Sequence, residues 1–317
     1  MSVLQQLSFS ISITGPICLM LFLGIYLKKI GLVNENFIDV GSKLVFQITL
    51  PIMLFLSIIT SKLDFSGSGT LIAYGLVANI LFFVFMTLIT KKIYPNQKDQ
   101  GVLIQGAYRA NTGIIGLAYV INTFGHSSIA IAAIYVASTT LLYNVLAVIA
   151  LSPASNQSGN QAISVIFKTL TKNPLIQAIL LGLVVYAFAI PIPEVAVKAG
   201  HYFANMTLPL ALLCTGGSLD LRSLKHEIMP AWYATFFRLV VCPLLLTAGG
   251  YILGFRGLEL GIIYLMSSGP AAAASYVMAR SMGGNAKLAA NIIALTTFMS
   301  LITTTVGIFI LSSMKVI

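Results

Sequence analysis

Long apolar runs separated by short polar breaks extend over nearly the whole chain. A helix that crosses a bilayer needs about 20 mostly apolar residues, and ten stretches meet that requirement. The predicted helices cover residues 7–27, 40–60, 71–90, 102–124, 128–151, 174–193, 201–219, 229–253, 258–280 and 286–311. The pattern therefore predicts an all-α membrane protein with ten transmembrane helices.

The two halves of the chain resemble each other at a nearly constant offset. The sequence Thr-Leu-Pro ends at Pro51 and again at Pro209, 158 residues later, and the pair Thr-Thr ends at Thr140 and at Thr297, 157 residues later. Each half holds five predicted helices, so the second half must enter the membrane from the opposite side. We expect an inverted repeat, which is common among secondary transporters. Its parts are a first repeat at 1–151, a polar linker at 152–163 and a second repeat at 164–317.

Composition and charge give the chain an orientation. Hydrophobic residues make up 58% of it and charged residues only 8%, which excludes an ordinary soluble domain. With the N-terminus outside, 12 Lys and Arg fall on the cytoplasmic side and 4 on the other, while Arg109 and Arg238 lie inside predicted helices. This is the positive-inside bias. It predicts a multi-pass protein of the cell (inner) membrane with both termini extracytoplasmic, and it explains the net charge of +10 without nucleic acid.

Two predicted helices carry polar residues at mid-depth. The fourth contains YRANTGIIG, which ends at Gly116, and the repeat offset leads from there to SSGP, which ends at Pro270 in the ninth. In the fourth helix we expect Asn111 or Thr112 to cap a second half-helix that begins near Gly113. In the ninth we expect Ser268 or Gly269 to cap one that has Pro270 in its first turn. The alternative for each is an ordinary kink.

Two broken helices would together form an anion site. Because the halves are inverted, the new N-terminal ends approach mid-depth from opposite sides, and each carries roughly half a positive charge. Arg109 either adds a full charge for the substrate or bonds freed carbonyls in a structural role. Hydroxyl groups in such helices often bond their own backbone instead. The predicted substrate-binding residues are Arg109, Asn111, Thr112, Gly113, Gly116, Ser267, Ser268, Gly269, Pro270, Asn144, Thr49 and Thr207.

The deep parts of the predicted helices lack acidic residues and histidine. All eight acids, and also His126, His201 and His226, fall in loops or at helix ends. A cation site or proton relay usually needs a carboxylate at mid-depth, so a carboxylate-based sodium or proton exchanger is disfavoured and an anion carrier is favoured. An enzyme would need a nucleophile with a base or paired acids. The three cysteines show no metal spacing, and we predict no catalytic residue, no metal and no cofactor.

Four segments in order resemble the auxin efflux carrier family, which includes bacterial malonate and malate permeases. They are RANTGIIGLAYV, NPLIQAILLGLVVYAFAIPIP, LPLALLCTGGSLDL and GPAAAASYVMARSMGGNAKLAANIIALTT. The resemblance implies an inverted five-plus-five repeat with crossed, broken helices 4 and 9, as in sodium/proton antiporters and bile-acid symporters. It also implies carboxylate substrates and elevator-type alternating access. The family usually has a proline shortly after the second glycine, where this chain has Leu117-Ala118.

The leading functional hypothesis is a secondary transporter of small organic anions such as malate or malonate. Helices 3–5 and 8–10 would form a transport domain, and helices 1, 2, 6 and 7 a scaffold that is a candidate homodimer interface. The short central linker favours the bacterial permease type. The expected partners are a small carboxylate and the lipid bilayer. Two alternatives stay open, a sodium- or proton-coupled symporter of the same fold and an anion channel.

Overall fold

The computed structural model describes residues 3–60, 68–94, 97–151, 174–219 and 228–317. Within these ranges the chain is helical, and the only β-type pairing is an isolated bridge. The predicted linker at 152–163 and the start of the second repeat lie outside the described residues. The elements are α1 (Val3–Lys29), α2 (Glu35–Leu44), η1 (Val45–Thr49), α3 (Leu50–Ile59), α4 (Ser68–Ile93), α5 (Gln97–Tyr108), η3 (Thr112–Gly116), α6 (Leu117–Phe124), η4 (His126–Ser128), α7 (Ile129–Leu151), α9 (Pro174–Ala187), α10 (Glu194–Ser218), α11 (Ile228–Phe236), η7 (Phe237–Val241), α12 (Cys242–Ile252), α13 (Gly257–Ser268), α14 (Ala274–Ser281) and α15 (Ala286–Ser313).

Six helical stretches in the described part are long and apolar enough to cross a membrane. They are Ser8–Lys29, Glu35–Ile59, Gly69–Ile93, His126–Leu151, Ile228–Ile252 and Ala286–Ser313. Three shorter apolar helices join them at Thr112–Phe124, Pro174–Ala187 and Gly257–Ser268. The prediction of an all-α, multi-pass protein agrees with this structure. The count of ten crossings and their inverted order stay predictions.

Two of the long helices contain a π-helical turn just before a proline. The helix expected at 40–60 begins earlier, at Glu35, where the Asn34 side chain accepts a hydrogen bond from the Phe37 amide at 2.8 Å. It then passes through the π-helical turn η1 just before Pro51. The turn η7 precedes Pro243 in the same way. Proline cannot donate to the carbonyl four residues back, and a local π-bulge is one way in which a helix accommodates that loss.

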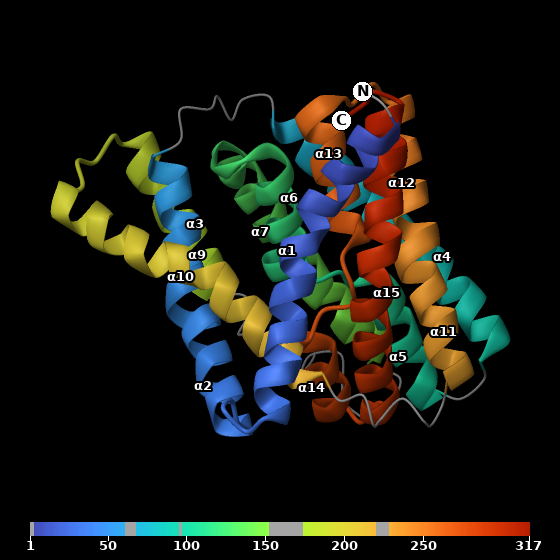
Figure 1. Cartoon of the computed structure of the whole chain (residues 1–317). Coiled ribbons are helices and arrows are strands. Elements are labelled where there is room, and N and C mark those ends of the chain that lie inside the picture. The colour runs from blue at the N-terminus through green and yellow to red at the C-terminus, as the bar shows by residue number, and fades with distance from the viewer. Residues whose placement is uncertain (1–2, 61–67, 95–96, 152–173, 220–227) are drawn as a thin grey trace.

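Two groups of helices lie on either side of a central set (Figure 1). Helices α2, α3, α9 and α10 lie to the left in that view, and α4, α11, α12 and α15 to the right, with α1, α6 and α7 between them. Helix α1 packs closely on α10, because a Cβ atom added at Gly24 would lie only 2.2 Å from the Leu213 carbonyl oxygen. The assignment of these groups to a scaffold and a transport domain stays a prediction.

Candidate functional site

The first helix break lies between α5 and η3. Helix α5 ends at Tyr108, and the chain is helical again from Thr112. Asn111 is the N-cap, because its side-chain oxygen accepts a hydrogen bond from the Ile114 amide at 3.3 Å. The restart is π-helical, with the Gly116 amide donating to the Asn111 carbonyl at 2.9 Å. The predicted Asn111 cap is therefore confirmed.

The second break, between α13 and α14, differs from its prediction. Ser268 is the last residue of α13, and Gly269 is extended, with φ −62° and ψ 155°. Helix α14 begins only at Ala274, and its N-cap, Ala273, offers no side-chain hydrogen bond. The expectation that Ser268 or Gly269 caps a helix with Pro270 in its first turn is wrong. Residues 270–272 instead form backbone hydrogen bonds and a bridge with the first break.

Backbone hydrogen bonds join the two breaks. The Asn111 amide donates to the Pro270 carbonyl at 2.8 Å, and the Ala272 amide donates to the Arg109 carbonyl at 3.0 Å, on either side of an antiparallel bridge between Ala110 and Ala271. We call residues 109–111 and 269–273 the crossover. Broken helices leave backbone groups that lipid cannot satisfy. These bonds satisfy several of them within the protein and fix the two breaks together.

Arg109 lies at the crossover and is 6% exposed. Its Nη2 donates to the side-chain oxygen of Asn144 on α7 at 2.8 Å, and its Nη1 donates to the sulfur of Met278 on α14 at 2.7 Å. Both partners are neutral. Among the described residues no acidic side chain pairs with this guanidinium, since the ion pairs there join Lys28 to Glu35 and Lys198 to Glu194. Arg109 thus contributes a buried positive charge without a carboxylate.

Arg238, which the sequence places inside a predicted helix, is fully buried in η7. Its Nη1 donates to the carbonyls of Tyr108 and Ala107, the latter at 3.3 Å. Its Nη2 donates to the carbonyl of Ser267. These carbonyls belong to the last turns of α5 and α13, which carry partial negative charge. Arg238 therefore bonds both half-helices at their C-terminal ends, which is a structural role.

Sequence reasoning did not connect Arg238 with the crossover. Its carbonyl partners are main-chain atoms, which leave no signal in the sequence, and they lie at least 29 residues away along the chain. The Cys242 sulfur, which accepts from Nη2 at 3.3 Å, lies on the same helix and does not point to the crossover. The available signal was the arginine itself, because a charge inside a membrane helix is rare and needs a partner.

Several predicted hydroxyl groups are occupied within their own helices. Ser267 Oγ donates to the Tyr264 carbonyl at 3.0 Å, and Ser268 Oγ donates to the Leu265 carbonyl at 3.2 Å. Thr207 Oγ1 donates to its own helix in the same way, at 3.2 Å. In this conformation these three groups would have to rotate, or accept a hydrogen bond, to contact a substrate.

The remaining predicted residues lie at different distances from the crossover. Thr112 is buried in the first turn of η3, and Gly113 is partly exposed. Gly116 lies against α13, where a Cβ atom would meet the Met266 sulfur at 2.9 Å. Thr49 is fully buried in η1 and its hydroxyl has no hydrogen-bond partner among the described residues. The structure thus brings together Arg109, Asn111, Thr112, Gly113, Gly116, Gly269, Pro270 and Asn144 around one crossover, together with the backbone of Ser267 and Ser268.

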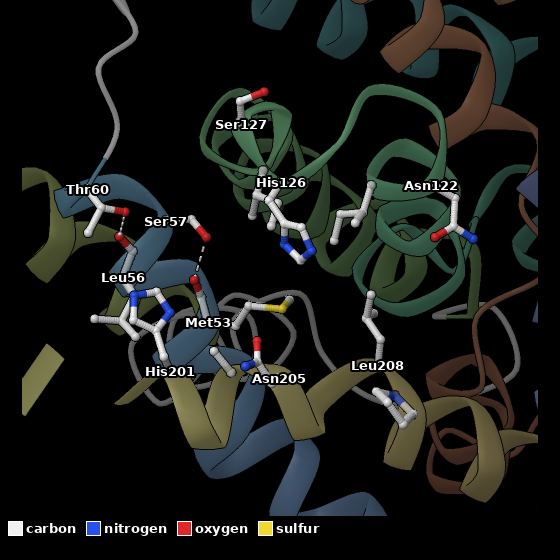
Figure 2. Close-up of a pocket in the computed structure, with 14 residues that line it drawn as sticks. Met53, Leu56, Ser57, Thr60, Asn122, His126, Ser127, His201, Asn205 and Leu208 are labelled. Carbon is white, nitrogen blue, oxygen red and sulfur yellow. Dashed lines mark hydrogen bonds between the residues drawn. The ribbon is translucent and has the colours of Figure 1, made fainter. Parts of the chain in front are cut away.

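A cavity of about 660 Å³ opens between α3 and α10 on one side and α6, η4 and the start of α7 on the other (Figure 2). None of the twelve predicted site residues lines it, although Thr207 directly precedes Leu208 and Pro209, which do. Sequence reasoning placed His126 and His201 at helix ends without bringing them together. The polar residues of the lining are Ser57, Thr60, Asn122, His126, Ser127, His201 and Asn205.

Comparisons with known proteins cover almost the whole chain. The family model described as membrane transport protein matches residues 11–308. An uncharacterized transporter of Methanothermobacter thermautotrophicus is 25% identical over 290 residues, which cover 90% of this chain and 93% of the relative. An uncharacterized transporter of Methanocaldococcus jannaschii is 25% identical over 300 residues, covering 90% and 94%. Neither name states a substrate.

Proposed function

The chain belongs to the membrane transport protein family, and on that premise we propose that it is a secondary transporter of small organic anions such as malate or malonate. The observation that carries the proposal is the buried Arg109 guanidinium, whose two hydrogen-bond partners are neutral. A buried charge in a membrane protein is a functional candidate by default. A carboxylate is the ligand that would balance this one.

The surroundings of Arg109 favour an anion over a cation. Asn111 caps η3 two residues further along, so the N-terminal end of that helical segment follows Arg109 closely in the chain. The N-terminal end of a helix attracts negative charge. The side-chain amide of Asn144 orients the guanidinium without neutralising it. A carboxylate in this position would accept hydrogen bonds from a charged donor, which are stronger than neutral ones.

The proposed transport mechanism is elevator-type alternating access. The third to fifth and the eighth to tenth of the predicted transmembrane helices would carry the crossover and its substrate as one rigid body. They would move past a scaffold of the first, second, sixth and seventh predicted helices. The crossover suits such a movement, because backbone hydrogen bonds join its two breaks and Arg238 bonds both half-helices. Neutralisation of Arg109 by the substrate would lower the cost of moving a charge through the membrane.

A coupled symporter of the same fold is the main alternative in transport. Its best argument would be a carboxylate near the crossover, which could bind sodium or a proton. No acidic residue contacts Arg109 among the described residues. That observation favours a carrier in which Arg109 meets only the substrate.

The experiment that tests the proposal is uptake of radiolabelled malate into liposomes that contain the purified protein. Unlabelled mono- and dicarboxylates serve as competitors, and empty liposomes give the background. Sodium and proton gradients are imposed separately, because uptake by a coupled symporter would depend strictly on one of them. We expect saturable uptake with competition by dicarboxylates. If a neutral or cationic solute is carried while no carboxylate is carried under any gradient, the proposal is wrong.

A further inference from the structure

The cavity beside α10 has the size and composition of a small-molecule site. Its volume of about 660 Å³ lies within the range of roughly 300–1,000 Å³ that is usual for such sites. Apolar side chains such as Met53, Leu56 and Ile121 form much of the lining. A few polar groups interrupt them, as in sites where apolar walls give affinity and polar groups give orientation.

Two histidines reach this cavity from elements that lie on opposite sides of it. His126 comes from η4, and His201 from α10, together with Asn205 one turn later (Figure 2). None of these three side chains has a hydrogen bond to another residue in the part of the chain that the structure describes. Asn122 donates to the Ile13 carbonyl at 2.9 Å, which leaves its side-chain oxygen available. The imidazoles are therefore not needed to satisfy the protein's own hydrogen bonds.

The described charges near the histidines would not repel an anion. The lining contains no Asp, Glu, Lys or Arg. On α10, Lys198 lies one turn before His201 and pairs with Glu194 at 2.8 Å. Lys62 and Asp64, which follow α3, lie outside the described residues. The packed helices α1 and α2 carry Lys28, Lys29, Glu35, Asp39 and Lys43, toward the other end of α10 where Gly217 meets Ile38.

We propose that this cavity is a first binding site for a small carboxylate, held between the imidazole rings of His126 and His201. The inference rests on the proposed function and adds a binding step in front of the crossover. The elements that present the two imidazoles belong to different predicted domains, since α10 belongs to the scaffold and η4 to the transport domain. A bound carboxylate would thus bridge the interface across which the elevator moves.

The proposal predicts which substitutions weaken binding. An imidazole N–H can donate a hydrogen bond to a carboxylate, and hydrogen bonds to a charged acceptor are stronger than those between neutral groups. Each histidine would therefore supply one donor to the bound carboxylate. Loss of one such bond is expected to raise the KM for uptake by about tenfold.

The test measures the KM for malate uptake by the wild type, His126→Leu and His201→Leu at one fixed pH, with EDTA present. Tyr202→Phe is the matched control, because Tyr202 adjoins His201 on α10, is 79% exposed and does not line the cavity. We expect a raised KM in both histidine variants and a wild-type KM in the control.

Two outcomes separate this inference from the proposed function. If uptake is saturable but the KM is the same in all four proteins, the cavity proposal is wrong and the transport proposal stands. If no carboxylate is transported, the stabilisation of each purified protein by malonate is measured by thermal unfolding. Stabilisation that is lost in both histidine variants supports the cavity site, and its absence in the wild type overturns it.

Discussion

Arg109 and Arg238 are buried arginines beside the same crossover, but they bind different kinds of partner. Arg238 donates to main-chain carbonyls at the C-terminal ends of α5 and α13, and also to the Cys242 sulfur at 3.3 Å. Arg109 donates to the side chains of Asn144 and Met278. Main-chain carbonyls at a helix end cannot move without unwinding the helix, whereas side chains can rotate. The comparison suggests that one arginine maintains the fold and the other can exchange its partners for a substrate.

The two charges are also balanced differently. The carbonyls that Arg238 contacts carry the partial negative charge of two helix ends, so its charge is compensated within the protein. An amide and a thioether compensate Arg109 much less. Substitutions of both arginines and their partners can therefore test whether the roles differ.

The largest effect on stability is expected from Arg238→Met, which removes the hydrogen-bond donors to the carbonyls at the ends of α5 and α13. Buried carbonyls without partners cost about 1–3 kcal/mol each, so we expect a loss of about 3–5 kcal/mol in the free energy of unfolding. Thermal unfolding in detergent measures it. Arg238→Lys is the control, because a single ammonium group keeps the charge but cannot form the same fork of hydrogen bonds, and it should lose less. Wild-type stability of Arg238→Met would show that the two roles are not distinct.

A smaller effect is expected from Asn144→Asp, which places a carboxylate beside Arg109. The new charge would compete with the substrate for the guanidinium, and we expect the initial rate of malate uptake to fall at least about tenfold, or about 1.4 kcal/mol. The fold should persist, because the new pair keeps the hydrogen bond. Asn144→Ala removes that bond but leaves the charge of Arg109 unbalanced, and it should reduce uptake less. Equal uptake by Asn144→Asp and the wild type would argue against substrate binding at Arg109.

The smallest effect is expected from Asn111→Ala, which removes the cap of η3. Loss of an N-cap costs about 1 kcal/mol, and the same change removes a polar group beside Arg109, so stability and the KM for malate should both change. Asn34→Ala is a matched control, because Asn34 caps α2 in the same manner at 2.8 Å. It should reduce stability without changing the KM. A KM change of the same size in both variants would mean that Asn111 acts only through stability.

Local chemistry explains which parts of the fold were predictable. The helix expected at 286–311 is α15, Ala286–Ser313. It was predictable because a long apolar run depends only on residues that are neighbours in the sequence. The Asn111 cap was predictable for the same reason. The resemblance to auxin efflux carriers is supported as far as membership in the membrane transport protein family. A malate or malonate permease remains a proposal.

Long-range contacts explain what the sequence did not reveal. Helix α14 begins later than predicted because residues 270–272 pair with Arg109 and Asn111, and because the Ala271 amide donates to Thr296 on α15 at 3.1 Å. His126 and His201 line one cavity although 75 residues separate them. A single sequence contains the residue types of such sites but not their distances.

The most direct test of the account compares malate uptake by Arg109→Gln with uptake by Arg256→Gln. Each variant loses one positive charge, but Arg256 is exposed and donates to the carbonyls of Tyr251, near the end of α12, and of Phe255, its neighbour in the chain. We predict that Arg109→Gln folds, as judged by size-exclusion chromatography and thermal unfolding, and that its uptake falls to the level of empty liposomes, while Arg256→Gln transports like the wild type. Uptake by Arg109→Gln with an unchanged KM would contradict the account, because Arg109 would then be structural like Arg238.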